Sequence, residues 1–393
     1  MSSIKRRRLA RLARDERRVI RSLNPKAVML GPPDSILVII ICSLVIFGIM
    51  AVFSAGAPEG AELYGNIAYF LIRHLIAVVI GLVCLIVAFN TNYNFWKKSV
   101  IPITYIIIAL IVATLIPGMG KTIYGSSRWL AGIPIQPSEF CKFATIILVS
   151  SAIVESKNFF DSKMIKHLFL IGVMIVVLLL QPNLSNALIL CFITATLMII
   201  GGVSFRFLLS LATMALLAIM TSIHSYQIDR VKGWLDPWAD PQGTGYNLIQ
   251  SYYAIGSGGI FGLGYGNSRQ KLFWLPFSHT DFIFAVIAEE LGLIGCLALL
   301  GLFLAFLHRG FYIANKCSDP FGKLFAFGIT FAIIVQAFIN IGVAVGTLPV
   351  TGVTLPLISH GGTSVVLTLF MTGILLNISR KRIRRLHTQR IRE

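Results

Sequence analysis

Three acidic side chains interrupt a stretch of the sequence that is otherwise apolar enough to cross a membrane. Asp281 stands where the apolar run begins, and Glu289 and Glu290 lie about two helical turns further along. Because a carboxylate in a lipid bilayer is costly, such residues are expected to be paired or to serve a function. An ionised carboxylate at the lip of a cavity can act as a general base towards a hydroxyl group that approaches it.

Asp281 has a second interpretation, as a carboxylate at the start of a helix. The helix dipole and the free N–H groups of the first turn favour an ionised side chain at that position. Against this interpretation, Ser278 and Thr280 already supply capping oxygens, and His279 stands beside the carboxylate. The sequence alone leaves both interpretations open.

Other charges also lie within or beside apolar runs. The helical rise places Arg73 and Glu289 at a similar depth, roughly 9–12 Å from the outer ends of their helices. We therefore expect Arg73 to neutralise Glu289 or Glu290 as a structural pair. The alternative is that these residues form the floor of a polar cavity open to the outside. Lys142 follows Glu139 by three residues, a spacing that allows contact between the two side chains.

The composition indicates that these charges belong to a membrane protein. Of the 393 residues, 56% are hydrophobic and 13% are charged, and the net charge is +18. The positive charge is concentrated at the ends, with ten Lys and Arg residues within 1–26 and seven within 380–392. Basic tails beside apolar runs are typical of topology signals and of contacts with anionic lipids, so we expect no nucleic-acid partner.

The apolar runs predict an all-α polytopic protein with ten membrane-spanning helices. We expect these helices to start near Ser35, Ile67, Ser99, Phe140, His167, Leu184, Phe207, Asp281, Phe325 and Thr363. With the amino terminus in the cytoplasm, the inner segments carry 26 Lys and Arg residues and the outer loops carry six, which is a strong positive-inside bias. The prediction therefore has basic cytoplasmic tails at residues 1–34 and 380–393, on either side of a membrane domain at 35–379.

Three segments of unusual composition fall on the outer side in this topology: 118–139, 223–280 and 347–362. The large outer loop, 223–280, is rich in Trp and Tyr, which favour the level of the lipid headgroups. Tyr246, Ile249 and Tyr253 share one helical face within this loop. We therefore expect a short interfacial helix there, with ordered turns around it.

Two glycine-rich stretches resemble nucleotide-binding loops but lack the required context. GMGKT (118–122) has Leu115 where a phosphate-binding loop needs its first glycine, and no strand is predicted before it. GIFGLGYG (259–266) has no dinucleotide-binding fold around it. Both stretches lie outside the cytoplasm in the predicted topology, so we expect no nucleotide cofactor.

Six blocks of sequence carry a resemblance to a known family. They are GSSRWL (125–130) with QPSEFCK (136–142), QPNLSNA (181–187), DPWADPQGTGYN (236–247), SGGIFGLGYGNSRQKL (257–272), HTDFIFAVIAEELG (279–292) and LPVTGVTLPLISHGGTS (348–364). In these blocks, and in their order, the chain resembles the SEDS family (shape, elongation, division and sporulation) of bacterial membrane glycosyltransferases. The resemblance extends over roughly residues 35–380.

The resemblance implies an activity and a catalytic residue. The family polymerises lipid II, a disaccharide-pentapeptide on undecaprenyl pyrophosphate, into glycan strands outside the cytoplasmic membrane. An aspartate of the HTDF block is the family's proposed catalytic residue, and that position is Asp281 here. It would deprotonate a sugar hydroxyl of the acceptor, which would attack the anomeric carbon of the donor with inversion. The family's activity is also associated with a divalent cation (Mg²⁺ or Mn²⁺), which could offset the pyrophosphate charge.

A pyrophosphate leaving group requires cations at the outer face, where the sequence offers few. Arg128 is the preferred candidate because arginine makes bidentate phosphate contacts, and Arg269 or Arg230 follows. Contact with lipid headgroups is the alternative for these cations. Further candidates for substrate contacts are Lys142, Glu139, His279 and Ser359. Glu139 could instead brace its helix, and the SHGG stretch that contains Ser359 could be a tight re-entrant turn.

Four positions depart from the family's usual pattern. Phe277 replaces a common Glu, Asn183 a common Asp, Asn247 the usual Gln and His360 the usual Tyr. None of these changes removes Asp281, so the activity is expected to be retained. The family's substrate contacts are not carried over at the four positions.

The long basic amino-terminal tail and Thr354 in TLPLIS resemble FtsW-like members more than RodA-like members. This implies septal wall synthesis in the bacterial cytoplasmic membrane, with a class B penicillin-binding protein as transpeptidase partner and with other division proteins. Alternatives are a RodA-like elongation polymerase, a lipid II flippase and a non-catalytic scaffold. The flippase is disfavoured because it needs a route through both leaflets, whereas the intramembrane charges cluster in the outer half.

Overall fold

The computed structural model describes residues 31–380 except for 124–125, 131–134, 157–160 and 221–224. The predicted basic tails lie outside the described residues apart from 31–34 and Arg380. The elements, in chain order, are α2 (Ser35–Tyr64), α3 (Tyr69–Asn90), α4 (Tyr93–Lys98), α5 (Val100–Ala113), β1 (Gly120–Ile123), β2 (Ser126–Leu130), α6 (Pro137–Glu155), α7 (Ser162–Leu180), α8 (Leu184–Ile200), α9 (Phe205–Met220), α10 (Ser225–Leu235), η1 (Pro237–Ala239), α11 (Tyr246–Gly258), α12 (Ile283–Lys316), α13 (Pro320–Ala344) and α14 (Gly362–Arg380).

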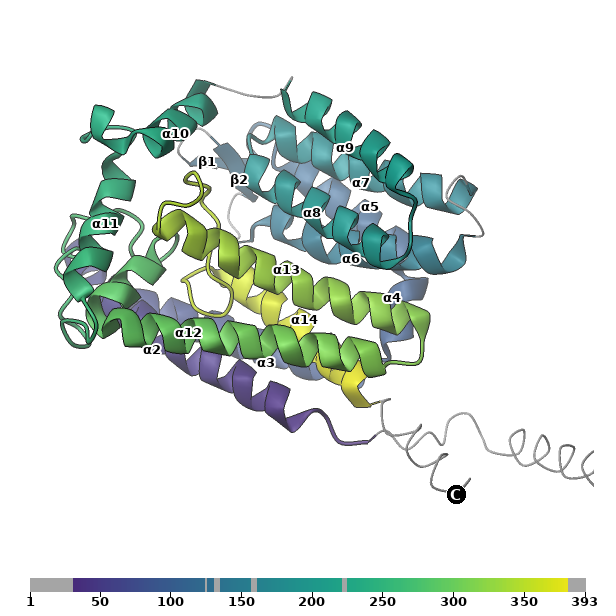
Figure 1. Cartoon of the computed structure of the whole chain (residues 1–393), viewed down its shortest axis with the longest axis horizontal. Helices are drawn as coiled ribbons and strands as arrows, with labels where there is room; N and C mark the ends of the chain where they lie inside the picture. Colours follow the sequence, from purple (N-terminus) through teal and green to yellow (C-terminus); the bar gives the residue numbers. More distant parts are fainter. Residues whose placement is uncertain (1–30, 124–125, 131–134, 157–160, 221–224, 381–393) are drawn as a thin grey trace, which may run out of the picture.

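The apolar helices lie side by side in one bundle (Figure 1). Seven helices of the described chain are long and apolar enough to cross a membrane, and α5, α8 and α9 are shorter apolar helices. Each of these ten helices begins within five residues of a predicted start. The chain is therefore an α-helical membrane protein, as its apolar runs predict.

The first described helix begins where a carboxylate caps it. Asp34 accepts a hydrogen bond from the Leu37 N–H at 3.1 Å, which satisfies one of the free donors of the first turn of α2. The same carboxylate contacts Arg309 Nε of α12 at 2.8 Å, and the Asp34 N–H donates to Ser379 Oγ of α14 at 3.1 Å. The two described ends of the chain therefore meet at one end of the bundle, on the right in Figure 1.

The core of the bundle lies around α6, α13 and α14, in which most side chains are buried. In contrast, α3 leaves many isoleucine, leucine and valine side chains exposed along its length. A helix that is apolar on its exposed face as well as on its buried face is typical of contact with lipid. The lipid-facing surface therefore includes α3, whereas α6 is enclosed by its neighbours.

The helices α10 and α11 lie at the other end of the bundle, on the left in Figure 1. The expected interfacial helix is present as α11. A two-stranded hairpin that the all-α prediction did not include also lies in this part of the chain: β1 and β2 pair antiparallel, with Gly120 opposite Leu130 and Lys121 opposite Trp129. As expected, no strand precedes the GMGKT stretch, which follows α5. The GMGKT stretch therefore leads into a strand, and the hairpin carries Arg128 on β2.

A break in α12 explains the glycine-rich stretch at 258–264. At Gly292 the backbone leaves the helical conformation (φ 64°, ψ −165°). Residues 259–264 supply the missing partners: the N–H groups of 263 and 264 donate to the carbonyls of 289 and 290 at 2.9 and 3.0 Å. The N–H groups of 293 and 294 donate to the carbonyls of 259 and 260 at 2.9 and 3.2 Å. A Cβ on Gly262 would lie 2.2 Å from the carbonyl oxygen of Glu290, so this close approach requires glycine.

Candidate active site

Asp281 lies in a turn just before α12 and does not cap that helix. α12 begins at Ile283 after the N-cap residue Phe282, and no described side chain makes a capping hydrogen bond there. The N–H groups of Thr280 and Phe282 close the turn by donating to the carbonyl of Phe277 at 3.1 and 3.2 Å. Asp281 therefore stands one residue before the N-cap of α12, and no side-chain capping hydrogen bond is found there among the described residues.

Three consecutive backbone carbonyls, those of residues 279–281, fix this turn to the rest of the bundle. The carbonyl of residue 281 accepts from Asn340 Nδ2 of α13 at 2.7 Å. The carbonyl of residue 280 accepts from Ser359 Oγ at 2.6 Å, and that of residue 279 from the His360 N–H at 2.9 Å. Ser359 is buried, and its hydroxyl also accepts from the Leu355 N–H at 2.8 Å. Both hydrogen bonds of the Ser359 hydroxyl thus hold protein segments together.

The side chain of Asp281 is half-buried. Its dense surroundings raise the pKa of Asp281 to about 6, against the lowering effects of Arg230, Arg128 and His279. With such a pKa, about nine in ten of these carboxylates are ionised at neutral pH. A carboxylate that is ionised but close to its pKa is well suited to accept a proton from a hydroxyl group.

Arg128 reaches the site from β2. Its Nη2 donates to the carbonyl of Pro182 at 2.6 Å, and the Tyr226 hydroxyl of α10 donates to the same oxygen at 2.8 Å. Burial lowers the pKa of Arg128, but an arginine remains charged at any physiological pH. Its Nε is buried and has no partner among the described residues. Arg128 is therefore a cation fixed by a hydrogen bond through Nη2, and its Nε–H group could donate to a ligand.

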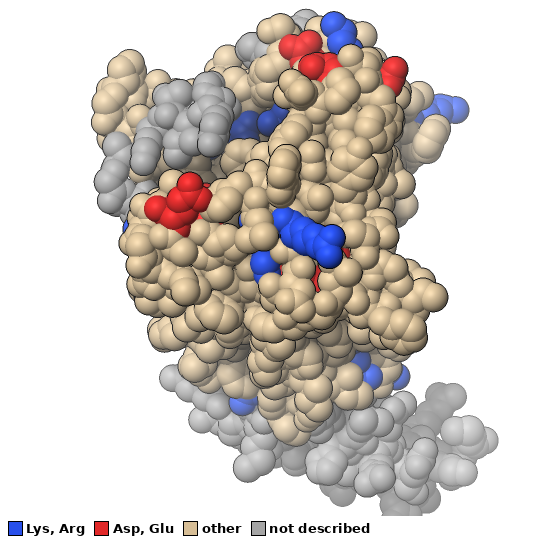
Figure 2. All heavy atoms as spheres, turned by 90° about the vertical axis from the view of Figure 1, so that its left-hand side faces the viewer, with Lys and Arg blue, Asp and Glu red and all other residues tan. Residues whose placement is uncertain are grey.

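Arg230 approaches from α10. Its Nη1 donates to the carbonyl of Val350 at 3.2 Å, and its guanidinium lies 5.6 Å from the ring centre of Tyr226. Trp234 of the same helix donates to the carbonyl of Gly346 at 2.8 Å. These bonds fasten α10 to the segment that precedes the turn at Ser359. Basic side chains lie in a hollow on the end of the molecule that carries α10 and α11 (Figure 2).

Some of the buried polar atoms that lack a partner lie on segments near Arg128 and Asp281. Within the described residues these include Arg128 Nε, Asn183 Nδ2 and Thr351 Oγ1. Asn183 follows the carbonyl that binds Arg128, and the backbone of Thr351 is tied to α8 through Ser185 Oγ at 2.7 Å. Such atoms also occur elsewhere among the described residues, for example Thr145 Oγ1 and Ser150 Oγ of α6, so they do not by themselves mark a ligand site.

Lys142 and Glu139 form a buried ion pair at the start of α6. Lys142 Nζ lies 2.8 Å from Glu139 Oε2 and 2.5 Å from Gln336 Oε1 of α13. Gln336 Nε2 donates in turn to the carbonyl of Thr354 at 3.0 Å. Both charged side chains are buried, so the pair connects α6 through α13 to the segment that holds the Asp281 turn.

His279 packs inside an aromatic cluster. Its Nδ1 lies 3.2 Å from Glu59 Oε2 of α2, although the two groups are not aligned as a hydrogen bond. The ring lies 4.2 Å from Phe70 and 5.7 Å from His360, measured between ring centres. The side chain is buried and thus positioned to support the Asp281 turn from the side of α2.

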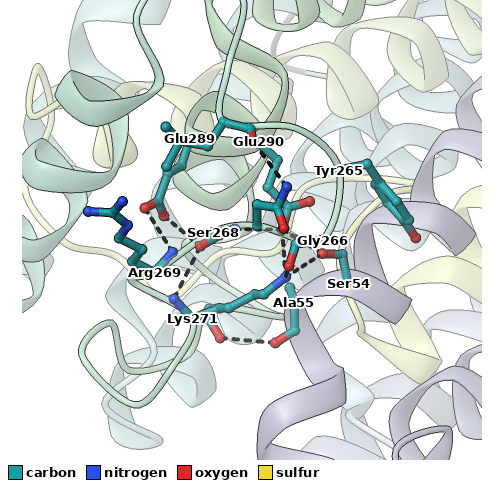
Figure 3. Close-up of polar contacts among 12 residues, drawn as sticks. Ser54, Ala55, Tyr265, Gly266, Ser268, Arg269, Lys271, Glu289 and Glu290 are labelled. Carbon is teal, nitrogen blue, oxygen red and sulfur yellow. Dashed lines mark hydrogen bonds and ion pairs between the residues drawn. The ribbon is translucent and has the colours of Figure 1, made fainter.

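Glu289 and Glu290 are fully paired by the loop before α12 (Figure 3). Glu290 Oε1 lies 2.7 Å from Lys271 Nζ and accepts from Ser54 Oγ of α2 at 2.5 Å. Glu289 accepts from Ser268 Oγ at 2.5 Å and from the N–H groups of residues 269 and 270 at 2.9 and 3.3 Å. The two carboxylates hold the loop of residues 266–271 against α12 and α2.

The expected pairing of Arg73 with Glu289 or Glu290 is wrong. Arg73 is exposed on α3, and its guanidinium lies 4.5 Å from the ring centre of Tyr69 one turn earlier. Lys271 takes the place of Arg73 as the partner of Glu290. Counted from the start of each helix at about 1.5 Å per residue, Arg73 lies about 6 Å into α3 and Glu289 about 9 Å into α12, so the expected depth fits Glu289 and not Arg73. In addition, α3 packs mainly against α14 and α2 rather than α12.

Arg269 is placed at the edge of the same loop. Its backbone N–H binds Glu289, and its side chain is exposed (Figure 3). In contrast, the charges of Arg230 and Arg128 lower the pKa of Asp281. Of the three arginines expected at the outer face, the structure thus brings Arg128 and Arg230 towards Asp281.

The described residues contain no group of three or more His, Cys, Asp or Glu side chains that could hold a metal ion. A site made entirely of protein ligands therefore does not fit this part of the chain. Mg²⁺ commonly uses one or two carboxylates together with the phosphates of a substrate.

Comparison with known proteins places these features in a family. The profile of the FtsW/RodA/SpoVE family, described as "Cell cycle protein", matches residues 34–384. The chain is 37% identical over 361 residues to the probable peptidoglycan glycosyltransferase FtsW of Trichlorobacter lovleyi, covering 90% of this chain and 95% of that protein. It is 38% identical over 355 residues to the stage V sporulation protein E of Bacillus subtilis, covering 88% and 97%. The chain belongs to this family.

Solved structures of FtsW/RodA/SpoVE-family proteins share the fold. A chain from a structure described as "Structural coordination of polymerization and crosslinking by a peptidoglycan synthase complex" matches with a TM-score of 0.73 and 30% identity, covering 89% of this chain and 98% of that chain. The rod shape determining protein RodA of Thermus thermophilus matches with a TM-score of 0.66 and 27% identity, covering 91% and 99%. The bundle described above is thus the fold of this family.

Sequence reasoning overlooked two amides of α13 in this FtsW/RodA/SpoVE-family protein. Gln336 and Asn340 lie four residues apart, and both contact the segment that faces Asp281. The signal was present, since polar side chains within an apolar membrane helix point to the interior of the bundle or to a functional site. Tyr226 of α10, which shares an acceptor with Arg128, had no comparable signal, because the 223–280 segment that contains it is rich in polar and aromatic residues.

Proposed function

We propose that this protein is a peptidoglycan glycosyltransferase that polymerises lipid II at the outer face of the bacterial cytoplasmic membrane. One observation carries the proposal: Asp281 is a half-buried carboxylate with a raised pKa, and two arginines from other elements act on its charge. This combination provides a base and cations in one place, as a reaction with a pyrophosphate leaving group requires. The names of the relatives support the same activity.

In the proposed reaction Asp281 accepts the proton of a sugar hydroxyl on the acceptor. The resulting oxygen attacks the anomeric carbon of the donor and forms the new glycosidic bond. The bond from that carbon to the pyrophosphate oxygen breaks, and undecaprenyl pyrophosphate leaves with the electron pair. Attack from the face opposite the leaving group inverts the anomeric configuration. The pyrophosphate leaves as an anion and takes no proton with it. The proton therefore remains on Asp281 until it is released to water.

Arg128 and Arg230 are the proposed partners of the leaving group. Negative charge develops on the pyrophosphate as the bond breaks, and fixed cations stabilise such charge most effectively where water is scarce. Arg128 offers its unpartnered Nε, and Arg230 is exposed enough to turn towards a ligand. Mg²⁺ or Mn²⁺ could add positive charge through phosphate oxygens, but no step above requires it.

The proposed topology has ten membrane-spanning helices and both termini in the cytoplasm. The bias of 26 Lys and Arg residues in inner segments against six in outer loops supports it. The likeness to FtsW supports a role in septal wall synthesis together with other division proteins. A class B penicillin-binding protein is the proposed transpeptidase partner, because one structurally related chain comes from a complex that coordinates polymerisation with crosslinking.

The test is polymerisation of labelled lipid II by the purified protein in liposomes. We expect glycan chains from the unaltered protein and none from Asp281→Asn, which should still bind lipid II. Asp229→Asn is the matched control, because that carboxylate is exposed in α10 and makes a 3.9 Å contact with Lys232. Normal chain formation by Asp281→Asn would remove Asp281 as the base. Transfer of lipid II between leaflets without any polymer would identify a flippase instead.

A further inference from the structure

Two amide side chains on α13 bind the segment that faces Asp281. Gln336 and Asn340 lie about one turn apart, and both are buried. Gln336 Nε2 donates to the carbonyl of Thr354 at 3.0 Å. Asn340 Nδ2 donates to the preceding carbonyl, that of Val353, at 2.7 Å. The second N–H of the Asn340 amide donates to the carbonyl of Asp281 at 2.7 Å.

One amide group therefore ties two chain segments that are distant in sequence. The first is the turn that carries Asp281, and the second is the backbone at 352–353. The two segments also meet directly, since a Cβ on Gly352 would lie 3.5 Å from Asp281 Oδ2. Gly352 has a φ of 70°, which favours glycine, so the backbone here packs closely against the carboxylate.

We infer that Asn340 is a positioning residue that sets the place of the Asp281 carboxylate relative to the backbone at Gly352. This inference rests on the proposed function, because it assigns a role to Asn340 in the same reaction. Asn340 acts through the backbone of Asp281 and touches no reacting atom. Its two donors have different acceptors, so losing the amide frees both segments at once.

The expected effect is on the rate of the chemical step. A general base works only when it lies within hydrogen-bond distance of the proton that it accepts. A shift of about 1 Å at such a group can reduce the rate about 100-fold. We therefore expect Asn340→Ala to lower kcat by about 10- to 100-fold, while KM for lipid II stays within about threefold because Arg128 and Arg230 are unchanged.

A second readout separates positioning from general loss of structure. The groups that act on Asp281 are Arg230 of α10, Arg128 of β2 and His279 of its own turn, but burial has the largest influence on its pKa. A loosened turn admits water to the carboxylate, which lowers the pKa from about 6 towards its ordinary value. The acid side of the pH profile should therefore move to lower pH in Asn340→Ala.

The matched control is Asn377→Ala. Asn377 is also a buried amide, near the carboxyl-terminal end of α14, and its Nδ2 donates to the carbonyl of Phe89 at 2.6 Å. That end of α14 lies at the opposite end of the bundle from the start of α12, which Asp281 precedes (Figure 1). Loss of the Asn377 amide also leaves a backbone carbonyl without a donor, yet it should leave kcat and the pH profile unchanged. Asn340→Leu keeps the size of the side chain and serves as a second variant in case the smaller residue destabilises the fold.

The experiment measures lipid II polymerisation per molecule of monodisperse protein, from about pH 5 to pH 8. A fall in kcat with a shifted acid limb in either Asn340 variant, absent from Asn377→Ala, supports the inference. Equal kcat values and equal pH profiles for the Asn340 and Asn377 variants overturn it while leaving the proposed function intact. Absence of polymer from the unaltered protein removes the proposed function itself, and the inference with it.

Discussion

The ammonium group of Lys271 lies 2.7 Å from Oε1 of Glu290, in an ion pair whose side chains are only 6% and 4% exposed. Ser54 of α2 donates to the same carboxylate oxygen. Three segments that are distant in sequence therefore meet at one atom (Figure 3). The pair holds the loop before α12 in place, so its contribution is to the stability of the region around the active site.

Removing one charge of the Lys271–Glu290 pair should destabilise the folded protein. Glu290→Gln is expected to lower the free energy of unfolding by about 3–5 kcal/mol, because Lys271 is left buried and without a counter-charge. Replacing both partners, by Lys271→Met with Glu290→Leu, should restore most of that loss. Denaturant unfolding in detergent micelles measures both, and Asp229→Asn, in an exposed pair, should cost less than about 1 kcal/mol. Equal losses in the single and double variants would contradict the prediction.

The pH dependence of polymerisation should reflect Asp281. A base must be ionised to accept a proton, so the rate should fall as the pH drops through the pKa of Asp281, about 6. An ordinary aspartate would place this limb near pH 4. Arg230→Gln removes a cation that favours the ionised form, so the limb should move to higher pH. Initial rates between about pH 4.5 and pH 8 test this, and a limb near pH 4 in the unaltered protein would be the contrary result.

Arg128 should matter for the chemistry and not only for affinity. Arg128→Ala is expected to lower kcat by about 100- to 1,000-fold, as the loss of one fixed donor to a developing charge commonly does. Arg128→Lys should recover little, because lysine cannot bind Pro182 and a phosphate with one planar group. Lys232→Ala provides the control, since that cation is exposed on α10. If single-turnover rates of the Arg128 and Lys232 variants are alike, Arg128 contacts headgroups only.

Two glycines should respond in opposite ways to a methyl group. Gly262→Ala is expected to destabilise the fold by several kcal/mol, because its Cβ would lie 2.2 Å from the carbonyl oxygen of Glu290 and its φ is 78°. Gly301→Ala, within α12, meets nothing within 4 Å and should be neutral or stabilising by up to about 1 kcal/mol. Thermal unfolding of the two variants decides the matter. A Gly262→Ala protein as stable as Gly301→Ala would show that the 258–264 segment does not pack so closely.

Features that depend on a single helix, such as where it begins, could be predicted from the sequence. The starts of the ten apolar helices follow from long apolar runs. The partner of Arg73 could not be predicted in this way, because depth says nothing about which helices are neighbours. α3 and α12 are not major neighbours in the bundle, and the loop lysine Lys271 reaches Glu290 first.

In the active site, too, some features could be predicted from the sequence and others could not. Asp281, Arg128 and Arg230 could be chosen because charged residues are rare among the apolar ones. The hairpin that carries Arg128 could not be predicted from the sequence. Its strands, GKTI and SSRWL, are short and lack the alternation of polar and apolar residues that is typical of a half-buried strand. The backbone bonds of residues 279–281 depend on segments more than 50 residues away, which no local pattern reveals.

The interruption of α12 at Gly292 has a mechanical consequence. The nine residues from Ile283 to Leu291, which follow directly on Asp281, are joined by hydrogen bonds to 263–264 rather than continued as one rod into the rest of the helix. On the far side of the break the N–H groups of 293 and 294 donate to the carbonyls of 259 and 260, so one glycine-rich segment anchors both sides of the interruption. The short segment next to the carboxylate is thus held by a loop as well as by the helix that follows it.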